Sequence, residues 1–258
     1  MNIRSKAKFA VLIAFRKAGY DIKRTDGKHG LNISEANAFD LETIQLASRF
    51  SMQSSERMWA LINSTKYVVN NNIPGHFVEC GVYKGGSALI IARTLKSMNV
   101  TDRHIYLYDT YEGMTQPRDV DRKQGTETLA SEMLAMTPKG NGENVWAYSS
   151  LEAVSDFVAH LDYPNDYFHL IKGDVMQTLE DKLPDNISLL RLDTDWYEST
   201  KKELQKLYPL VTCGGVVIID DYGHWSGSKL AVNQFLEESS LNPLMNYIDY
   251  AGRLWIKN

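Results

Sequence analysis

Acidic side chains occur in two pairs in the second half of the chain, and each pair directly follows an apolar run of strand-like sequence. Asp193 and Asp195 follow one run, and Asp220 and Asp221 follow the other. Because functional residues of a parallel sheet collect at the carboxyl ends of its strands, we expect the four carboxylates to converge. Their repulsion favours a bound divalent cation, and an all-oxygen ligand set suits Mg²⁺, with Mn²⁺ or Ca²⁺ as substitutes. Helix caps and solvated turn residues are the alternative.

Asp193 and Asp195 are two positions apart, so they point to the same side if the strand continues through them. One carboxylate can then hold the metal while the other faces a substrate proton. A hydroxyl is a poor nucleophile at neutral pH, and a coordinated divalent cation lowers the pKa of an oxygen acid. The pattern indicates metal-assisted deprotonation, with Asp195 or a metal ligand such as Asp193 as the base.

A glycine-rich turn lies between a predicted strand and a predicted helix, in the segment VECGVYKGGSALIIARTL at residues 78–95. Glycines let the backbone turn tightly and let a ligand approach its amides. The spacing of Gly81, Gly85 and Gly86 matches neither the phosphate loop nor the dinucleotide pattern. Glu79 would repel a pyrophosphate but suits an amino group or a sulfonium cation, which favours S-adenosylmethionine over ATP or NAD. An ordinary strand–helix turn is the alternative.

Two further strand ends carry acids. Asp109 ends the predicted second strand, where a carboxylate commonly accepts hydrogen bonds from a ribose diol. A turn residue or a cap is the alternative for Asp109. Gly173 and Asp174 repeat the glycine-and-acid pattern after the third strand.

Strands and helices alternate after residue 73, which predicts an α/β fold with a Rossmann-like, doubly wound and mostly parallel sheet. The tail at residues 245–257 is typical of a hairpin, which must be antiparallel. The predicted strands are residues 76–78, 104–108, 168–171, 188–192 and 215–219, and the predicted helices are residues 87–98, a helix that Ser150 caps, 199–208 and 229–238.

Residues 1–72 are predicted to be an all-helical N-terminal extension. The apolar period of residues 2–20 indicates an amphipathic helix that packs on the body or on a second subunit, with a membrane-surface role as the lesser alternative. Ser34 is expected to cap a helix through about Phe50, and Ser54 or Ser55 to cap a helix over residues 56–71.

Residues 113–145 are rich in Thr, Gly, Asp and Lys and contain one helical segment, at residues 127–136. A connection of this length is too long for an ordinary loop in a compact domain. We therefore expect a lid insertion around these residues.

The composition is that of an ordinary globular protein of 258 residues, with 43% hydrophobic and 23% charged residues. The net charge of −4 provides no field that would attract nucleic acid. Cys80 and Cys213 lie in apolar runs without a zinc-type cluster, which favours reduced thiols and a cytoplasmic location. The apolar run at residues 9–15 is too short to span a bilayer, so no membrane partner is expected.

Taken together, these segments resemble the macrocin O-methyltransferase family, whose members are S-adenosylmethionine-dependent and metal-dependent enzymes that methylate sugar hydroxyls of antibiotics and related glycosides. The resemblance covers most of residues 52–257. The segments that carry it are FVECGVYKGGS at 77–87, YDTYEGM at 108–114, LDTDWYEST at 192–200, LYP at 207–209 and GGVVIIDDYGHW at 214–225.

The resemblance implies that Asp193, Asp220 and Asp221 bind Mg²⁺ and that Asp195 is the general base. It also implies a methyltransferase domain at residues 73–258, and dimer and lid elements within residues 1–72. The implied cofactor-binding residues are Glu79, Cys80, Gly81, Gly85, Ser87, Asp109, Thr110, Gly173 and Asp174. The candidates for the substrate site are His224, Tyr111 and Tyr222, with wall or core packing as the alternative for each.

We therefore expect a cytoplasmic homo-oligomer whose substrate is a small glycoside or sugar. Three other functions stay open at this point. They are a catechol-type O-methyltransferase, a methyltransferase for a polysaccharide sugar, and a non-catalytic protein that binds S-adenosylmethionine. The acidic pairs argue against the last, since a binding module needs neither a metal nor a base.

Overall fold

The computed structural model describes residues 33–136 and 146–258. The chain divides into two compact units, Met1–Glu35 and Ala36–Asn258, and the second contains every element described below. The helix predicted over residues 2–20 lies outside the described residues, as does the end of the predicted lid insertion.

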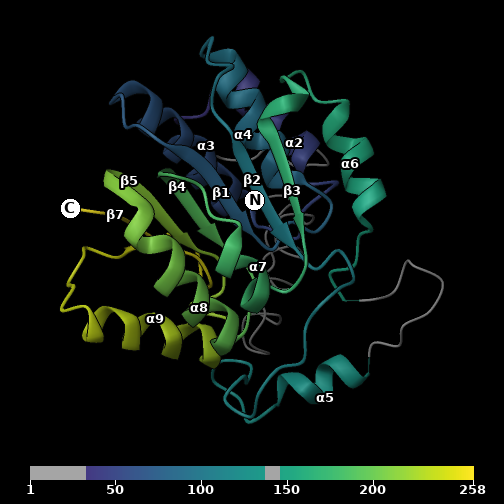
Figure 1. The fold of residues 1–258 in the computed structure, drawn as a ribbon, viewed down its shortest axis with the longest axis vertical. Coiled ribbons are helices and arrows are strands. Elements are labelled where there is room, and N and C mark those ends of the chain that lie inside the picture. The colour runs from purple at the N-terminus through teal and green to yellow at the C-terminus, as the bar shows by residue number, and fades with distance from the viewer. Residues whose placement is uncertain (1–32, 137–145) are drawn as a thin grey trace, which may run out of the picture. The chain divides into compact units, whose positions relative to one another are not determined.

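The described residues form a seven-stranded sheet in the order β3-β2-β1-β4-β5-β7-β6 (Figure 1). The first five strands of the chain pair in parallel, whereas β7 pairs antiparallel with β5 and β6. The predicted mostly parallel α/β sheet and its antiparallel C-terminal hairpin are therefore confirmed. The strands are β1 His76–Cys80, β2 Ile105–Asp109, β3 Phe168–Lys172, β4 Ile187–Leu192, β5 Val211–Ile219, β6 Asn246–Tyr247 and β7 Arg253–Ile256.

Helices cover both faces of the sheet. Figure 1 shows α7, α8 and α9 on one face and α3 and α4 on the other, and the contacts of α8 with α7 and α9, and of α3 with α4, agree. The helices are α2 Ala38–Ala47, α3 Ser55–Asn70, α4 Gly86–Ser97, α5 Ala130–Ala135, α6 Leu151–Ala159, α7 Val175–Asp181, α8 Tyr197–Leu207 and α9 Ser226–Glu238, with short 3-10 turns at Asn165–Tyr167 and Tyr208–Leu210.

Side-chain caps explain where several helices begin. Ser54 and Ser150 each accept a hydrogen bond from the backbone N–H three residues on, as predicted. The prediction that Ser34 caps the first described helix is wrong. Asn37 caps α2 instead, because Asn37 and Asp40 form a reciprocal capping box, and the helix ends at Ala47 rather than near Phe50. The sequence analysis missed α7, which the Asp174 side chain caps.

The central strand β4 is buried along its whole length, as expected for a parallel strand with helices on both faces. Its apolar sequence is interrupted by Arg191, whose side chain is only 1% exposed. A charge at that depth requires partners of opposite charge. These partners lie at the carboxyl ends of the neighbouring strands, where the candidate site is found.

The insertion that follows β2 is tied to the N-terminal ends of α8 and α9. Fully buried Asp121 accepts hydrogen bonds from the backbone N–H groups of Tyr197 and Arg118, at 2.8 and 2.7 Å. A Cβ on Gly227 would lie 1.7 Å from Asp121 Oδ1, so only glycine lets α9 approach this closely. The helix predicted at residues 127–136 is shorter than expected, Ala130–Ala135.

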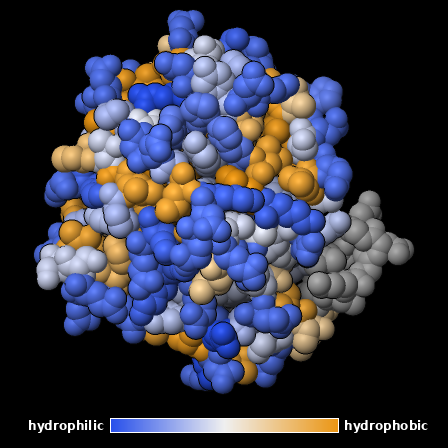
Figure 2. All heavy atoms as spheres, viewed as in Figure 1, coloured by the Kyte–Doolittle hydropathy of each residue, from blue (hydrophilic) through white to orange (hydrophobic). Residues whose placement is uncertain are grey.

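The face of the molecule that Figures 1 and 2 show is mixed in polarity, with hydrophobic side chains in small patches between larger hydrophilic areas (Figure 2). No helix within residues 33–136 and 146–258 is long and apolar enough to cross a membrane.

The anchoring of the insertion by Asp121 can be tested with Asp121→Ala. The substitution removes the acceptor of two backbone N–H groups, so we expect urea denaturation to show a loss of about 2–3 kcal/mol in the free energy of unfolding. Asp119→Ala, an exposed position nearby, is the control and should change it by less than about 0.5 kcal/mol. Equal losses in the two variants would contradict the anchoring role.

Candidate active site

A cleft opens at the carboxyl edge of the sheet, where the strand order reverses between β1 and β4. In open α/β sheets this switch point is the usual place for a ligand. Residues at or just after the ends of all five parallel strands line the cleft. The predicted site residues among them are Glu79, Gly81, Ser87, Asp109, Thr110, Gly173, Asp174, Asp193, Asp195, Asp220, Asp221 and His224.

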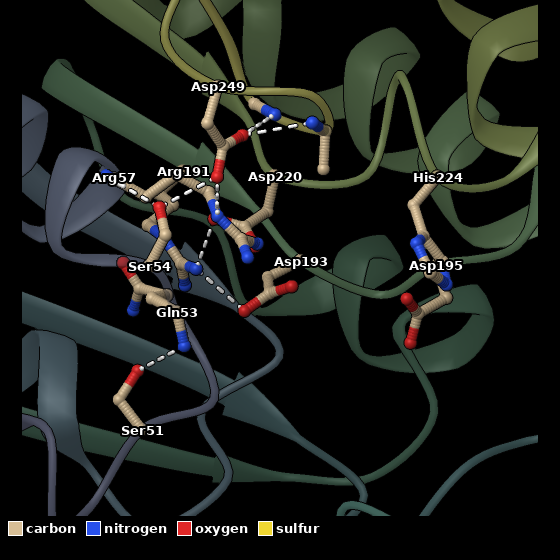
Figure 3. A network of polar contacts seen from close by, with 12 residues as sticks. Ser51, Gln53, Ser54, Arg57, Arg191, Asp193, Asp195, Asp220, His224 and Asp249 are labelled. Atoms are coloured by element: carbon tan, nitrogen blue, oxygen red, sulfur yellow. Dashed lines mark hydrogen bonds and ion pairs between the residues drawn. The ribbon is translucent and has the colours of Figure 1, made fainter. Parts of the chain in front are cut away.

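The buried guanidinium of Arg191 joins three carboxylates that line this cleft, and Figure 3 shows two of them, Asp193 and Asp220. Its Nη1 contacts Glu79 at the end of β1, and its Nη2 donates to Asp193 at 2.7 Å and to Asp220 at 2.6 Å. Burial raises the pKa of Glu79 to about 7, although the charge of Arg191 opposes that rise. Arg191 therefore connects the glycine turn after β1 to the acids after β4 and β5.

A second arginine reaches the same acids from α3. Arg57 Nη1 contacts Asp220, and its Nε donates to Asp249 at 3.0 Å (Figure 3). Asp249 in turn accepts hydrogen bonds from the backbone N–H groups of Ala251 and Gly252, in the turn before β7. Arg57 therefore links α3, the end of β5 and the C-terminal hairpin.

Asp193, Asp220 and Asp221, the acidic triad, offer ligand oxygens that all lie within 4.8 Å of one another. Buried Asp221 Oδ2 has no hydrogen-bond partner among the described residues. Burial, and then the neighbouring carboxylates, raise the pKa of Asp221 well above its usual range. A pocket with this excess of carboxylate over guanidinium fits a divalent cation, and its all-oxygen donors suit Mg²⁺.

Asp195 is separate from the Arg191 contacts in Figure 3. Its Oδ1 accepts a hydrogen bond from the Trp225 indole at 2.8 Å, and burial followed by the charge of Asp193 raises its pKa to about 8. The predicted strand alternation between Asp193 and Asp195 is wrong, because β4 ends at Leu192 and Asp195 has a left-handed φ of 65°. Both side chains line the cleft nevertheless, because the chain turns at this point.

The other half of the cleft surrounds the glycine turn. Asp109 Oδ2 accepts hydrogen bonds from Val82 and Tyr83, at 2.7 and 3.1 Å, so the end of β2 holds this turn in place. Gly81 has a φ of 87°, and a Cβ there would lie 2.0 Å from the carbonyl oxygen of Asp193. The glycine therefore permits the close approach of the β1 and β4 ends.

The sequence model of the Macrocin-O-methyltransferase family matches residues 37–257, a range that contains every residue of the cleft. The chain belongs to this family. The resemblance predicted from the sequence motifs is therefore confirmed, and the protein is an O-methyltransferase.

Relatives of this family member match most of its length. Demethyldecarbamoylnovobiocin O-methyltransferase of Streptomyces niveus is 30% identical over 81% of this chain and 76% of its own. Mycinamicin III 3''-O-methyltransferase of Micromonospora griseorubida is 25% identical over 80% of this chain and 77% of its own. The solved structure of the O-methyltransferase NovP has a TM-score of 0.69 at 30% identity, covering 81% of this chain and 82% of that one. The calicheamicin methyltransferase CalS11 shares the fold, with a TM-score of 0.54 at 18% identity, covering 91% and 99%.

Four predicted site residues of this O-methyltransferase do not line the cleft. Cys80 is buried in the apolar core, and Gly85 is the left-handed cap of α4, packed against Phe157. Tyr111 is 2% exposed and donates its hydroxyl hydrogen bond to the Leu107 carbonyl. Tyr222 donates to Asn233, so packing rather than ligand contact explains these side chains.

Residues of the loop between α2 and α3 line the cleft although the sequence analysis missed them. Gln53 Nε2 donates to Ser87 at 2.7 Å, while Gln53 Oε1 is buried without a partner among the described residues. Glu79 Oε2 is a second buried acceptor of this kind. No local pattern marks Gln53, whereas the charge of Arg191 within an apolar strand was a usable signal.

An aromatic wall completes the cleft on the side of Asp195. Trp146 and Trp225 line it, with ring centroids 5.8 Å apart, and Trp196 packs against both. Tyr250, whose hydroxyl lies 3.0 Å from His224 Nδ1, adds a polar edge. Sequence reasoning predicted His224 and the adjacent Trp225 of this set. It missed Trp146, Trp196 and Tyr250, which come from other segments of the chain.

Gly81→Ala tests the close approach of the β1 and β4 ends. The added methyl group would overlap a backbone atom at a left-handed position, so we expect a loss of about 3–5 kcal/mol in the free energy of unfolding. Gly125→Ala is the matched control, since Gly125 also has a positive φ but its Cβ would meet nothing within 4 Å. That control should lose only about 1 kcal/mol, and similar losses in the two variants would contradict the steric explanation.

Proposed function

We propose that this O-methyltransferase transfers a methyl group from S-adenosylmethionine to a sugar hydroxyl of a glycosylated natural product. The observation that carries the proposal is that one cleft contains both the unpartnered oxygen of Glu79, beside the glycine turn, and the acidic triad. The acceptor class is supported by relatives, one of which, from Streptomyces olivaceus, is named for 4'-O-methylation of a rhamnosyl-tetracenomycin.

The half of the cleft around the glycine turn is proposed to bind the cofactor. Glu79 Oε2 and Gln53 Oε1 are buried acceptors that would otherwise stay unsatisfied, so an ammonium group of the methionyl part suits them. Asp109 and Thr110 lie at the end of β2, where a ribose diol is commonly held. Gly173 and Asp174 would flank the adenine. The cofactor itself supplies an electrophilic methyl group on a sulfonium centre.

The acidic triad is proposed to hold Mg²⁺. When bound, the cation would lower the pKa of an acceptor hydroxyl. The two arginines keep the remaining negative charge of the pocket low, since Arg191 and Arg57 both contact Asp220.

The reaction requires the acceptor oxygen to bond to the methyl carbon while the carbon–sulfur bond breaks, with its electron pair remaining on sulfur. The hydroxyl proton must pass to a base, and Asp195 is the proposed one. The Trp225 indole fixes the orientation of the Asp195 carboxylate, and burial of this carboxylate increases its affinity for a proton. The sulfonium becomes a neutral thioether, and the ionised Asp195 carboxylate becomes a neutral acid when it takes the hydroxyl proton. One positive and one negative charge are lost together, so the total charge is unchanged.

The acceptor is proposed to lie against the aromatic wall. Trp146 offers an apolar ring to a sugar or aglycone, and His224 and Tyr250 offer polar groups to hydroxyls. The homo-oligomer, the cytoplasmic location and the division of the chain into an extension and a domain stay predictions.

Calorimetric titration with S-adenosylmethionine, before and after removal of divalent cations by chelation and dialysis, tests the cofactor and metal assignments. We expect a Kd of about 1–100 μM and methylation of vicinal-diol glycosides, by mass spectrometry, that stops on chelation and returns with Mg²⁺. Buffer of the same ionic strength without Mg²⁺ is the control. Absence of cofactor binding would overturn the proposal, unchanged turnover after chelation would remove the metal, and turnover of aryl diols alone would favour a catechol-type enzyme.

Asp195→Asn tests the base. The amide keeps the size of the side chain and an acceptor oxygen for Trp225 but cannot take the proton, so kcat should fall by about 10²–10⁴-fold while the Kd for S-adenosylmethionine changes less than about twofold. Asp119→Asn on the surface is the control. Full turnover by Asp195→Asn would exclude Asp195 as the base.

A further inference from the structure

The segment that carries Asp193 and Asp195 leaves the sheet through a tight and unusual turn. Asp193 N–H still donates to the Cys80 carbonyl at 2.8 Å, as a strand residue would. Two residues later Asp195 has a φ of 65°, a left-handed conformation that is uncommon for residues with a side chain and that aspartate adopts more readily than most. Such a conformation persists only where the surroundings impose it, and it commonly marks a functional site.

Thr194, the residue between the two acids, is held in place by several hydrogen bonds. The Thr194 carbonyl accepts hydrogen bonds from Trp196 N–H at 2.7 Å and from the Ser199 hydroxyl at 3.3 Å. The Thr194 hydroxyl donates to the carboxyl group of Glu203, with distances of 2.9 and 3.1 Å to its two oxygens. The carbonyl and the hydroxyl of Thr194 are therefore both held by α8 or by Trp196, the residue that precedes it.

Glu203 is an unexpected residue at this place. It is completely buried on α8, and burial raises the pKa of its carboxyl group well above the usual range. No arginine, lysine or histidine is paired with it among the described residues, and its carboxyl group is hydrogen-bonded to Thr194. Burying a carboxyl group without a cation lowers stability, so an apolar residue of similar shape would suit the fold better.

We propose that Glu203 is a positioning residue, which holds Thr194 so that the side chains of Asp193 and Asp195 both enter the cleft. This rests on the proposed function, because it assigns Glu203 to the two carboxylates used there. Glu203 itself does not line the cleft. Its effect reaches the reaction through the backbone of the turn, where a small displacement of two reacting groups has a large effect on rate.

The test compares a conservative variant with an apolar one. Glu203→Gln can still exchange hydrogen bonds with Thr194, so its kcat should stay within about twofold of the wild type. The double variant Thr194→Val/Glu203→Met removes both partners together and leaves no unpaired group, which is close to neutral for stability. We expect its Tm to equal or exceed that of the wild type, its kcat to fall at least about tenfold, and its KM for S-adenosylmethionine to change less than about threefold.

Thr200→Val, an isosteric change at another buried position of α8, is the control and should leave both Tm and kcat unchanged. A double variant with wild-type kcat would overturn the proposal. So would one whose Tm falls together with kcat, because Glu203 would then be a support of the fold alone. A Glu203→Gln variant as slow as the double variant would likewise exclude positioning through this hydrogen bond.

A crystal structure of the double variant separates this proposal from the proposed function. If the wild-type protein methylates no acceptor, the proposed function is overturned, regardless of the conformation of the turn. The φ of Asp195 in the crystal structure of the double variant would still test the role of Glu203. A turn that loses its left-handed residue supports positioning by Glu203, and an unchanged turn overturns it.

Discussion

The arrangement of the cleft depends on a buried guanidinium in the central strand. Arg191 contacts Glu79, Asp193 and Asp220, which come from the ends of β1, β4 and β5. Without this charge, Glu79 and Asp193 would have no cationic partner among the described residues. Arg191 therefore makes an acidic pocket compatible with a folded sheet, and it connects the glycine turn after β1 to the acidic triad.

These ion pairs of Arg191 require the backbone at the ends of β1 and β4 to adopt a particular geometry. The ends of β1 and β4 approach so closely that only glycine fits at position 81, and Asp109 fixes the turn that follows through backbone N–H groups. Arg57 adds a second positive charge from α3 and ties it to the C-terminal hairpin through Asp249. Helix α3 and the C-terminal hairpin are thus both held to the acids of the cleft.

The parts of the site that follow strand order could be predicted from the sequence. Asp193, Asp220 and Asp221 stand directly after apolar strands, and parallel pairing alone brings such positions together. Gln53 and Arg57 could not be predicted, because loop and helix residues reach the cleft by tertiary packing that no local pattern records. Glu203 could not be predicted for the same reason, since its contact with Thr194 depends on how α8 packs. The same limit explains why Tyr111 and Tyr222 were expected near the substrate: an aromatic residue after a strand can turn into the core as easily as into a cleft.

The two halves of the cleft come from different kinds of secondary structure. The half that is proposed to bind the cofactor consists of strand ends and one glycine turn, whose geometry the parallel sheet imposes. The half that is proposed to bind the acceptor contains Trp146, His224 and Tyr250, carried by loops and by the residues before β7. Loops tolerate substitution and change of length far better than strand ends do. Acceptor preference can therefore change while the cofactor half is kept, which fits a family whose relatives are named for novobiocin, tetracenomycin and mycinamicin substrates at 25–30% identity to this chain. Under the proposed function, the aromatic wall is therefore the part of the cleft that would recognise this chain's own acceptor.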